Sequence, residues 1–112
     1  MKVAIPVVRG RLSAHFGHCE QFAIFEVDEE EKKITGQEVL EAPEHAPGLF
    51  PRWLKKQGVQ VVLVGGLGQR ARAFFDECGL KVITGAPEEV PEALVMAYLN
   101  GTLVTGENIC DH

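Results

Sequence analysis

Hydrophobic and polar positions in the first half of the chain follow patterns typical of β-strands. β-Branched and alternating runs predict three strands over residues 1–8, 22–27 and 34–40. The acidic run at 28–31 is expected to be a solvated turn that joins the second and third strands into a hairpin. Residues 9–20, between the first two strands, show little periodicity and are expected to form a loop.

The second half of the chain shows helical spacing in three stretches, each followed by a glycine that can end a helix. Residues 61–64 are continuously apolar and predict a central strand covered on both faces. Residues 81–84 predict a further short strand. The faces predicted for the helices are Leu49, Phe50, Trp53 and Leu54; Ala71, Phe74, Phe75 and Cys78; and Val90, Ala93, Leu94 and Ala97.

This order of elements, β-β-β-α-β-α-β-α, predicts an α/β fold in which a hairpin extends a three-layer, mixed sheet. A chain of 112 residues is long enough for one hydrophobic core. We expect a single α/β domain over residues 1–101, followed by a C-terminal tail over 102–112 that carries Cys-Asp-His.

Composition narrows the class of protein. The net charge of -5, from 16 acids and 11 bases without a basic tract, argues against nucleic acid as a partner. The chain shows no signal-peptide pattern and no apolar run of membrane-spanning length, so we expect a cytoplasmic protein without a membrane partner. Three cysteines, an odd number, fit free thiols or metal ligands better than a disulfide framework.

Candidate chemistry gathers where the parallel strands should end, because ligands of open α/β sheets bind beyond the carboxyl ends of the strands. The loop 9–20 holds two imidazoles and a thiol within five positions, and such donors suit iron, copper and softer metals. Other imidazoles and thiols lie outside the predicted helices and strands. The candidate metal ligands are His15, His18, Cys19, His45, Cys110 and His112.

The opposite side of this predicted site is a glycine turn that leads directly into a helix. Free backbone N–H groups and the positive end of the helix dipole would favour an anion there. Arginines in the first loop and in the first helical turn would add positive charge. The candidate cofactor-binding residues are Arg9, Ser13, Gly65, Gly66, Gly68 and Arg70.

Structural interpretations of the same residues remain open. His15 could cap a neighbouring backbone group, Cys19 could be a small, partly buried hydrophobe, and the glycines could merely allow a tight strand-to-helix connection. Catalytic sets are absent from the pattern: there is no Gly-x-Ser-x-Gly elbow and no carboxylate on the central strands. We therefore expect a binding protein rather than an enzyme.

Three segments together resemble the dinitrogenase iron-molybdenum cofactor biosynthesis family, which includes NifX-like proteins and the C-terminal part of NifB. They are His-Phe-Gly at 15–17, Val-Val-Leu-Val-Gly-Gly-Leu-Gly-Gln-Arg-Ala at 61–71, and the closing Cys-Asp-His at 110–112. The likeness runs over nearly the whole chain. His15, Cys110 and His112 match the family's motif residues, whereas His18 stands where many relatives have a basic residue.

The resemblance implies a ribonuclease H-like fold with a five-stranded mixed sheet. It also implies a nitrogen-fixation-related accessory protein that binds, carries or stores an iron-, molybdenum- or copper-containing sulfide cluster, with a cluster-donating or cluster-accepting protein as partner. Two alternatives stay open. One is a small-molecule enzyme or anion-binding module that uses the same strand-end cleft, and the other is a regulatory interaction domain with an apolar partner surface around Phe50 and Trp53, if these two side chains are exposed.

Overall fold

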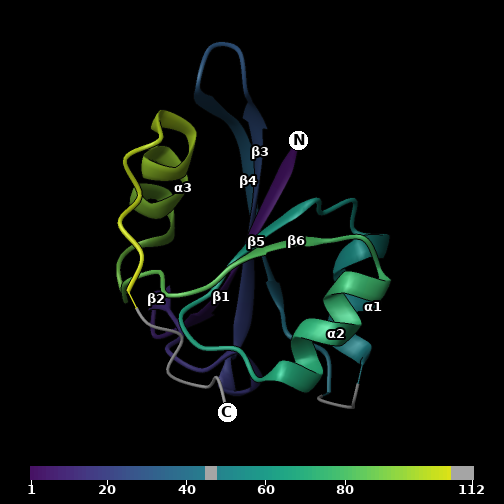
Figure 1. Ribbon diagram of the computed structural model, residues 1–112. Coiled ribbons are helices and arrows are strands. Elements are labelled where there is room, and N and C mark those ends of the chain that lie inside the picture. The colour runs from purple at the N-terminus through teal and green to yellow at the C-terminus, as the bar shows by residue number, and fades with distance from the viewer. Residues whose placement is uncertain (45–47, 107–112) are drawn as a thin grey trace.

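The computed structural model describes residues 1–44 and 48–106, which fold into a mixed α/β unit (Figure 1). Its secondary structure follows the predicted order, with a short additional strand and a 3₁₀ helix between the first two long strands. The elements are β1 (Lys2–Val8), β2 (Arg11–Leu12), η1 (Phe16–His18), β3 (Gln21–Asp28), β4 (Lys33–Glu41), α1 (Leu49–Lys56), β5 (Val61–Leu63), α2 (Gln69–Glu77), β6 (Lys81–Ile83) and α3 (Pro91–Asn100).

The strands form one mixed sheet with the order β4-β3-β1-β5-β6, and β2 pairs with β1 beside this path. β1, β5 and β6 run parallel, so their carboxyl ends share one edge of the sheet. β3 and β4 form the antiparallel hairpin that extends the sheet on the other side of β1. The predicted mixed sheet with a hairpin extension is confirmed.

Helices cover both faces of the sheet, with α3 on one face and α1 and α2 on the other (Figure 1). Alternate residues of the central strands therefore enter two different cores. In β5, Val61 and Leu63 pack into the core with α3, while Val62 packs into the core with α1 and α2. All three are at most 4% exposed, so the strand is covered on both faces as its apolar run predicted.

The predicted helix ends of α1 and α2 are confirmed by their hydrogen bonds. After α1, the N–H of Gly58 donates to the carbonyl of Lys55 and that of Val59 to the carbonyl of Leu54. After α2, the N–H of Leu80 donates to the carbonyl of Phe75 in the same arrangement. This Schellman pattern satisfies carbonyls that the helix leaves without partners, and the apolar residue after the glycine closes the end by packing into the core.

The buried stripe of α3 lies one residue later in the chain than predicted. Val90 is not inside the helix: it is the extended N-cap residue and is 49% exposed, and the helix starts at Pro91. Proline fits the first helical position because its fixed φ suits the helix and its missing N–H would have no partner there. The buried stripe is therefore Pro91, Leu94 and Val95, whereas Ala93 is exposed.

Among the residues that the structure describes, no helix is both long and apolar enough to cross a lipid bilayer.

Candidate functional site

The segment after β1 and the glycine turn after β5 were expected to meet at the carboxyl edge of the sheet, and they do meet there through backbone hydrogen bonds, together with the connection after β6. The N–H of Phe16 donates to the carbonyl of Gly66 at 3.1 Å, and the N–H of Gly66 donates to the carbonyl of Ala14 at 2.7 Å. The N–H of Gly85 in turn donates to the carbonyl of Gly65 at 2.8 Å. Residues from three separate connections thus form one continuous backbone network, which we call the strand-end edge.

The segment after β1 contains regular secondary structure where a loop was predicted. Arg11 and Leu12 turn back as β2 and pair with Val8 and Val7. Leu12 is 1% exposed, which explains why a short strand forms here: its side chain enters the core with α3. The sequence pattern missed this strand because two residues are too few to show alternation.

Phe16 anchors the next part of the segment in the core beneath α1 and α2. Its ring is 5% exposed and lies 5.2 Å from the ring of Phe75, 5.4 Å from that of Phe50 and 5.8 Å from that of Phe22, between centroids. Tilted and edge-to-face rings at such distances attract one another beyond simple burial. The role of Phe16 was not predicted, although an aromatic residue in a polar segment was a signal for it.

His15 is exposed at the strand-end edge while its backbone is held on both sides. It forms an isolated parallel bridge with Gly66, and the next residue is the buried Phe16. The buried hydroxyl of Ser13 donates a hydrogen bond of 2.8 Å to the carbonyl of His15. The fold therefore fixes the backbone of His15 and directs the predicted ligand outward, and Ser13 acts on that backbone from inside the protein.

The glycine turn differs from the prediction in one respect that concerns anion binding. The N–H of Gly66 was expected to be free for a ligand, but it is hydrogen-bonded to Ala14. Gly65 is also buried, and a Cβ atom there would lie 3.1 Å from the carbonyl oxygen of Ala14. Gly65 therefore allows two backbones to pack closely, and the hydrogen bond of Gly66 joins them. Gly68 is the N-cap of α2, with Arg70 exposed in the first turn.

The arginines of the first segment lie on either side of the β1–β2 turn. Arg9 is exposed with a φ of 54°, and its N–H lies 3.4 Å from Oε1 of Glu20. Arg11 donates from Nη1 to the carbonyl of Glu88 at 3.4 Å. Arg11 therefore ties β2 to the segment that precedes α3, while Arg9 stays at the surface.

Cys19 is half-buried and packs against the core beneath α1 and α2. Burial raises the pKa of its thiol to about 11, because the thiolate would lose solvation, and a backbone hydrogen bond offsets only part of this rise. At neutral pH the group is a thiol. A metal that binds Cys19 must therefore displace a proton.

Several predicted ligands cannot be placed. His45, Cys110 and His112 lie outside the described residues, as does the side chain of His18. Among the side chains that are described, no group of three or more His, Cys, Asp or Glu residues is arranged to hold a metal ion. Two predicted metal ligands are described, and they differ: His15 is exposed and Cys19 is half-buried.

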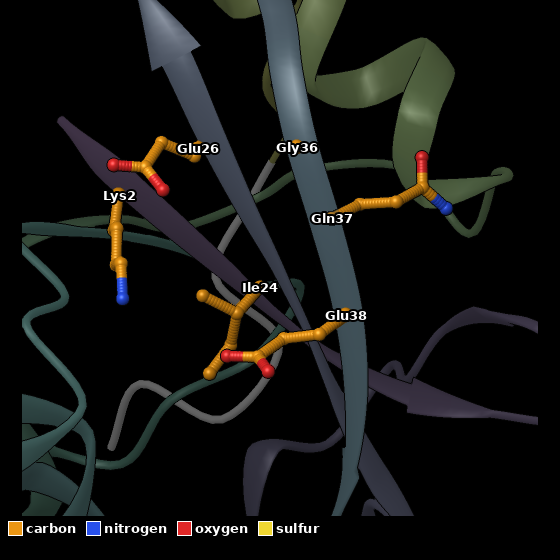
Figure 2. Close-up of a pocket in the computed structure, with 6 residues that line it drawn as sticks. All are labelled: Lys2, Ile24, Glu26, Gly36, Gln37 and Glu38. Carbon is orange, nitrogen blue, oxygen red and sulfur yellow. The ribbon is translucent and has the colours of Figure 1, made fainter.

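A groove with a volume of about 320 Å³ lies elsewhere, on the sheet face near the start of β1 (Figure 2). Its polar groups are two glutamates, one glutamine and one lysine, and Nζ of that lysine, Lys2, donates to the carbonyl of Gln57 at 3.1 Å. None of the described residues that line this groove carries an imidazole or a thiol, so they do not supply the donors of the predicted site. Its lining residues are Lys2, Ile24, Glu26, Gly36, Gln37 and Glu38.

The apolar partner surface suggested around Phe50 and Trp53 is wrong for Phe50. Its side chain is 3% exposed and contacts the rings of Phe16 and Phe22. Trp53 is half-buried, with its ring centroid 5.4 Å from that of Phe22. These rings form part of the core because α1 turns its apolar stripe towards the sheet.

The chain belongs to the family described as dinitrogenase iron-molybdenum cofactor, because the model of that family matches residues 1–101. The uncharacterized protein MJ0580 of Methanocaldococcus jannaschii is 32% identical over 108 residues, which cover 92% of this chain and 89% of the relative. The family membership predicted from the sequence is confirmed.

Solved structures share the fold. The crystal structure of PH0822 matches with a TM-score of 0.87 and 29% identity over 96% of each chain. The apo form of the orange protein from Desulfovibrio gigas matches with a TM-score of 0.71 and 21% identity, over 96% of this chain and 93% of that one.

Proposed function

We propose that this protein is a non-enzymatic carrier that takes up a metal-sulfide cluster as cargo at the strand-end edge, with His15 as its first ligand. The observation that supports this most directly is the environment of His15, which is exposed at the edge while the backbone on both sides of it is fixed. Membership in the iron-molybdenum cofactor family makes a metal-sulfide cluster the favoured cargo.

The donor set suits a cargo better than a permanently bound metal. Imidazole nitrogen binds iron and copper, and sulfur donors favour the softer metals. A cluster contributes its own sulfides, so few protein ligands suffice to hold it, and a carrier with few ligands can release it. In this proposal Cys110 and His112 supply further donors, and exposed Arg70 at the start of α2 balances negative charge on the sulfides.

Cys19 has a secondary role in the proposal. Its thiol is protonated at neutral pH because burial raises its pKa, so metal binding there would release a proton and favour higher pH. Cluster uptake that depends on His15 should therefore continue without Cys19. We place the carrier in the cytoplasm, where thiols stay reduced, and expect a cluster-donating or cluster-accepting protein as its partner.

Anaerobic reconstitution tests the proposal. The protein is incubated with iron, molybdate, copper and sulfide, desalted, and analysed for metals and sulfide and by visible absorption. We expect metal and sulfide to stay with the wild type and to fall roughly tenfold or more in His15→Ala. Gln60→Ala is the matched control, because it changes an exposed polar residue at the opposite end of β5.

Two comparisons separate the ligands. Cys19→Ala and Cys78→Ala each remove one half-buried thiol. Cys78 caps the distant end of α2, so Cys78→Ala should leave uptake unchanged at every pH, whereas Cys19→Ala should keep uptake at neutral pH and lose only the additional uptake at higher pH. A metal-free wild type would contradict the proposal. A His15→Ala variant that binds as much cluster as the wild type would contradict the role of His15. Phosphate that raises the melting temperature of metal-free protein would instead favour the anion-binding alternative.

A further inference from the structure

The chain returns to the strand-end edge after its last helix. α3 begins near this edge, since the N–H of Leu12 donates to the carbonyl of Glu89 just before the helix. The helix has ten residues, which span about 15 Å, and residues 102–106 then run back beside it (Figure 1). Five extended residues cover about 16 Å, so this return is nearly straight.

Gly106 joins the backbone network at the end of this return. Its N–H donates to the carbonyl of Gly85 at 2.7 Å, and the N–H of Gly85 donates to Gly65 in the glycine turn. Four backbone segments therefore lie in a hydrogen-bonded row. The segment that ends at Gly106 pairs with Gly85, Gly85 pairs with the glycine turn, and the glycine turn pairs with residues 14–16. Few side chains hold residues 102–106, because Leu103 is only half-buried and Val104 is 81% exposed.

The contact between Gly85 and Gly106 requires glycine at position 85. A Cβ atom there would lie 2.1 Å from the carbonyl oxygen of Gly106 and 2.9 Å from its nitrogen, which are distances that real Cβ atoms do not occupy. Gly85 also has a φ of +79°. At position 106 the demand is weaker, since an added Cβ would be 3.8 Å from the carbonyl oxygen of Gly85.

We infer that Gly85 and Gly106 are positioning residues that dock residues 102–106 on the strand-end edge, and that the cluster is retained only while this tail is docked. The inference rests on the proposed function and deepens it by adding residues 102–106 to the strand-end edge. The hydrogen bonds support it, because Gly106 is joined to Gly85, and Gly85 is joined to Gly65 in the glycine turn beside His15.

Gly85→Ala tests the inference against a closely matched control. Gly10 has the same φ of +79°, but an added Cβ there meets nothing within 4 Å, so Gly10→Ala imposes a similar backbone conformation without the clash. Heteronuclear NOE values of residues 102–106 in metal-free protein report docking. We expect them to fall in Gly85→Ala and to stay at the wild-type level in Gly10→Ala.

A second pair of variants keeps the test valid if Gly85→Ala folds poorly. Gly106→Pro removes the N–H that bonds to Gly85, whereas Gly106→Ala keeps it and adds only an ordinary contact. Of these two variants, only Gly106→Pro should release residues 102–106.

Cluster retention is then measured in the same variants by anaerobic reconstitution with iron, molybdate, copper and sulfide. We expect roughly tenfold weaker retention in Gly85→Ala and Gly106→Pro, and wild-type retention in both controls. A released tail with unchanged retention overturns the inference and leaves the proposed function intact, as does a tail that stays docked in Gly106→Pro. A wild type that takes up no cluster overturns both, while the NOE data still show whether the tail docks.

Discussion

At the scale of single residues, His15 and Phe16 show how adjacent positions serve opposite purposes. Phe16 is 5% exposed among three other aromatic rings, while His15 is exposed at the strand-end edge. Removing the Phe16 ring would cost about 3–5 kcal/mol of stability, as is usual for buried aromatic residues. The phenylalanine thus fixes the segment from which the proposed ligand projects.

Cys19 gives a prediction about pH. Because burial raises the pKa of its thiol in the folded protein from 9.0 to about 11, the folded state holds this proton more tightly than the unfolded state does. The contribution of this proton to the free energy of unfolding is fully present below pH 9 and is lost as the pH rises towards 11. Urea unfolding should show the free energy of unfolding falling more steeply in the wild type than in Cys19→Ala over this range.

The two proteins are identical except at position 19, so the difference between their free energies of unfolding at each pH is the informative quantity. Iodoacetamide labelling of Cys19 provides an independent measurement, and its rate should still be rising above pH 9. The raised pKa of Cys19 would be contradicted if the free energy of unfolding had the same pH dependence in both proteins and the labelling rate levelled off near pH 8.

The residues of the candidate site could be predicted only in part. Imidazole and thiol donors are visible in the sequence because their chemistry belongs to the residue type. Whether a thiol is solvated, or whether the N–H of Gly66 already has a partner, depends on segments that are distant in the chain. The sequence therefore identified His15 and Cys19 as candidates, and only the fold distinguished an exposed imidazole from a half-buried thiol.

At the scale of elements, α3 shows the limit of reading a helix from its period. The predicted and observed faces have the same spacing but differ by one position, and a shift of one residue rotates a helical stripe by about 100°. Pro91 sets where the helix starts and the sheet selects which stripe is buried. The core then takes Leu94 and Val95, together with the partly buried Tyr98.

One pair of substitutions distinguishes the buried stripe that is observed in α3 from the stripe that the sequence predicted. Val95 is 0% exposed, so Val95→Ala should lower the free energy of unfolding by roughly 2 kcal/mol through lost burial and the cavity left behind. Val90 is 49% exposed at the N-cap, and Val90→Ala should change it by less than about 0.5 kcal/mol. Guanidinium unfolding measures both, and equal losses would contradict the observed face.

At the scale of the whole molecule, a sheet covered on both faces carries the strand-end edge, where we propose that the cargo binds. The parallel strands β1, β5 and β6 bring three connections together, and the antiparallel hairpin enlarges the sheet away from them. The hairpin is less covered than the centre, since most residues of β4 are exposed. Resistance to local opening should therefore be greater in the central strands than in the outer strand β4.

Hydrogen exchange followed by mass spectrometry should show this difference. Peptides from β1 and β5 should be the slowest to exchange, because these strands are paired on both sides and covered on both faces. Peptides covering β4 should exchange earlier through local opening, since β4 is an outer strand of the described sheet. Equal protection of β4 and β1 would show that the sheet opens only as a unit.

The sequence by itself determined the order of elements, the strand covered on both faces, the glycine-ended helices and the family, because these follow from local periodicity and from residue types. The tertiary structure decided which stripe of α3 is buried, that β2 exists, that Phe16 is a core residue, and that Gly66 and Gly85 join distant backbones through hydrogen bonds. Local preferences act within a few residues. Burial and backbone pairing across the strand-end edge instead depend on which distant segments the fold places beside them.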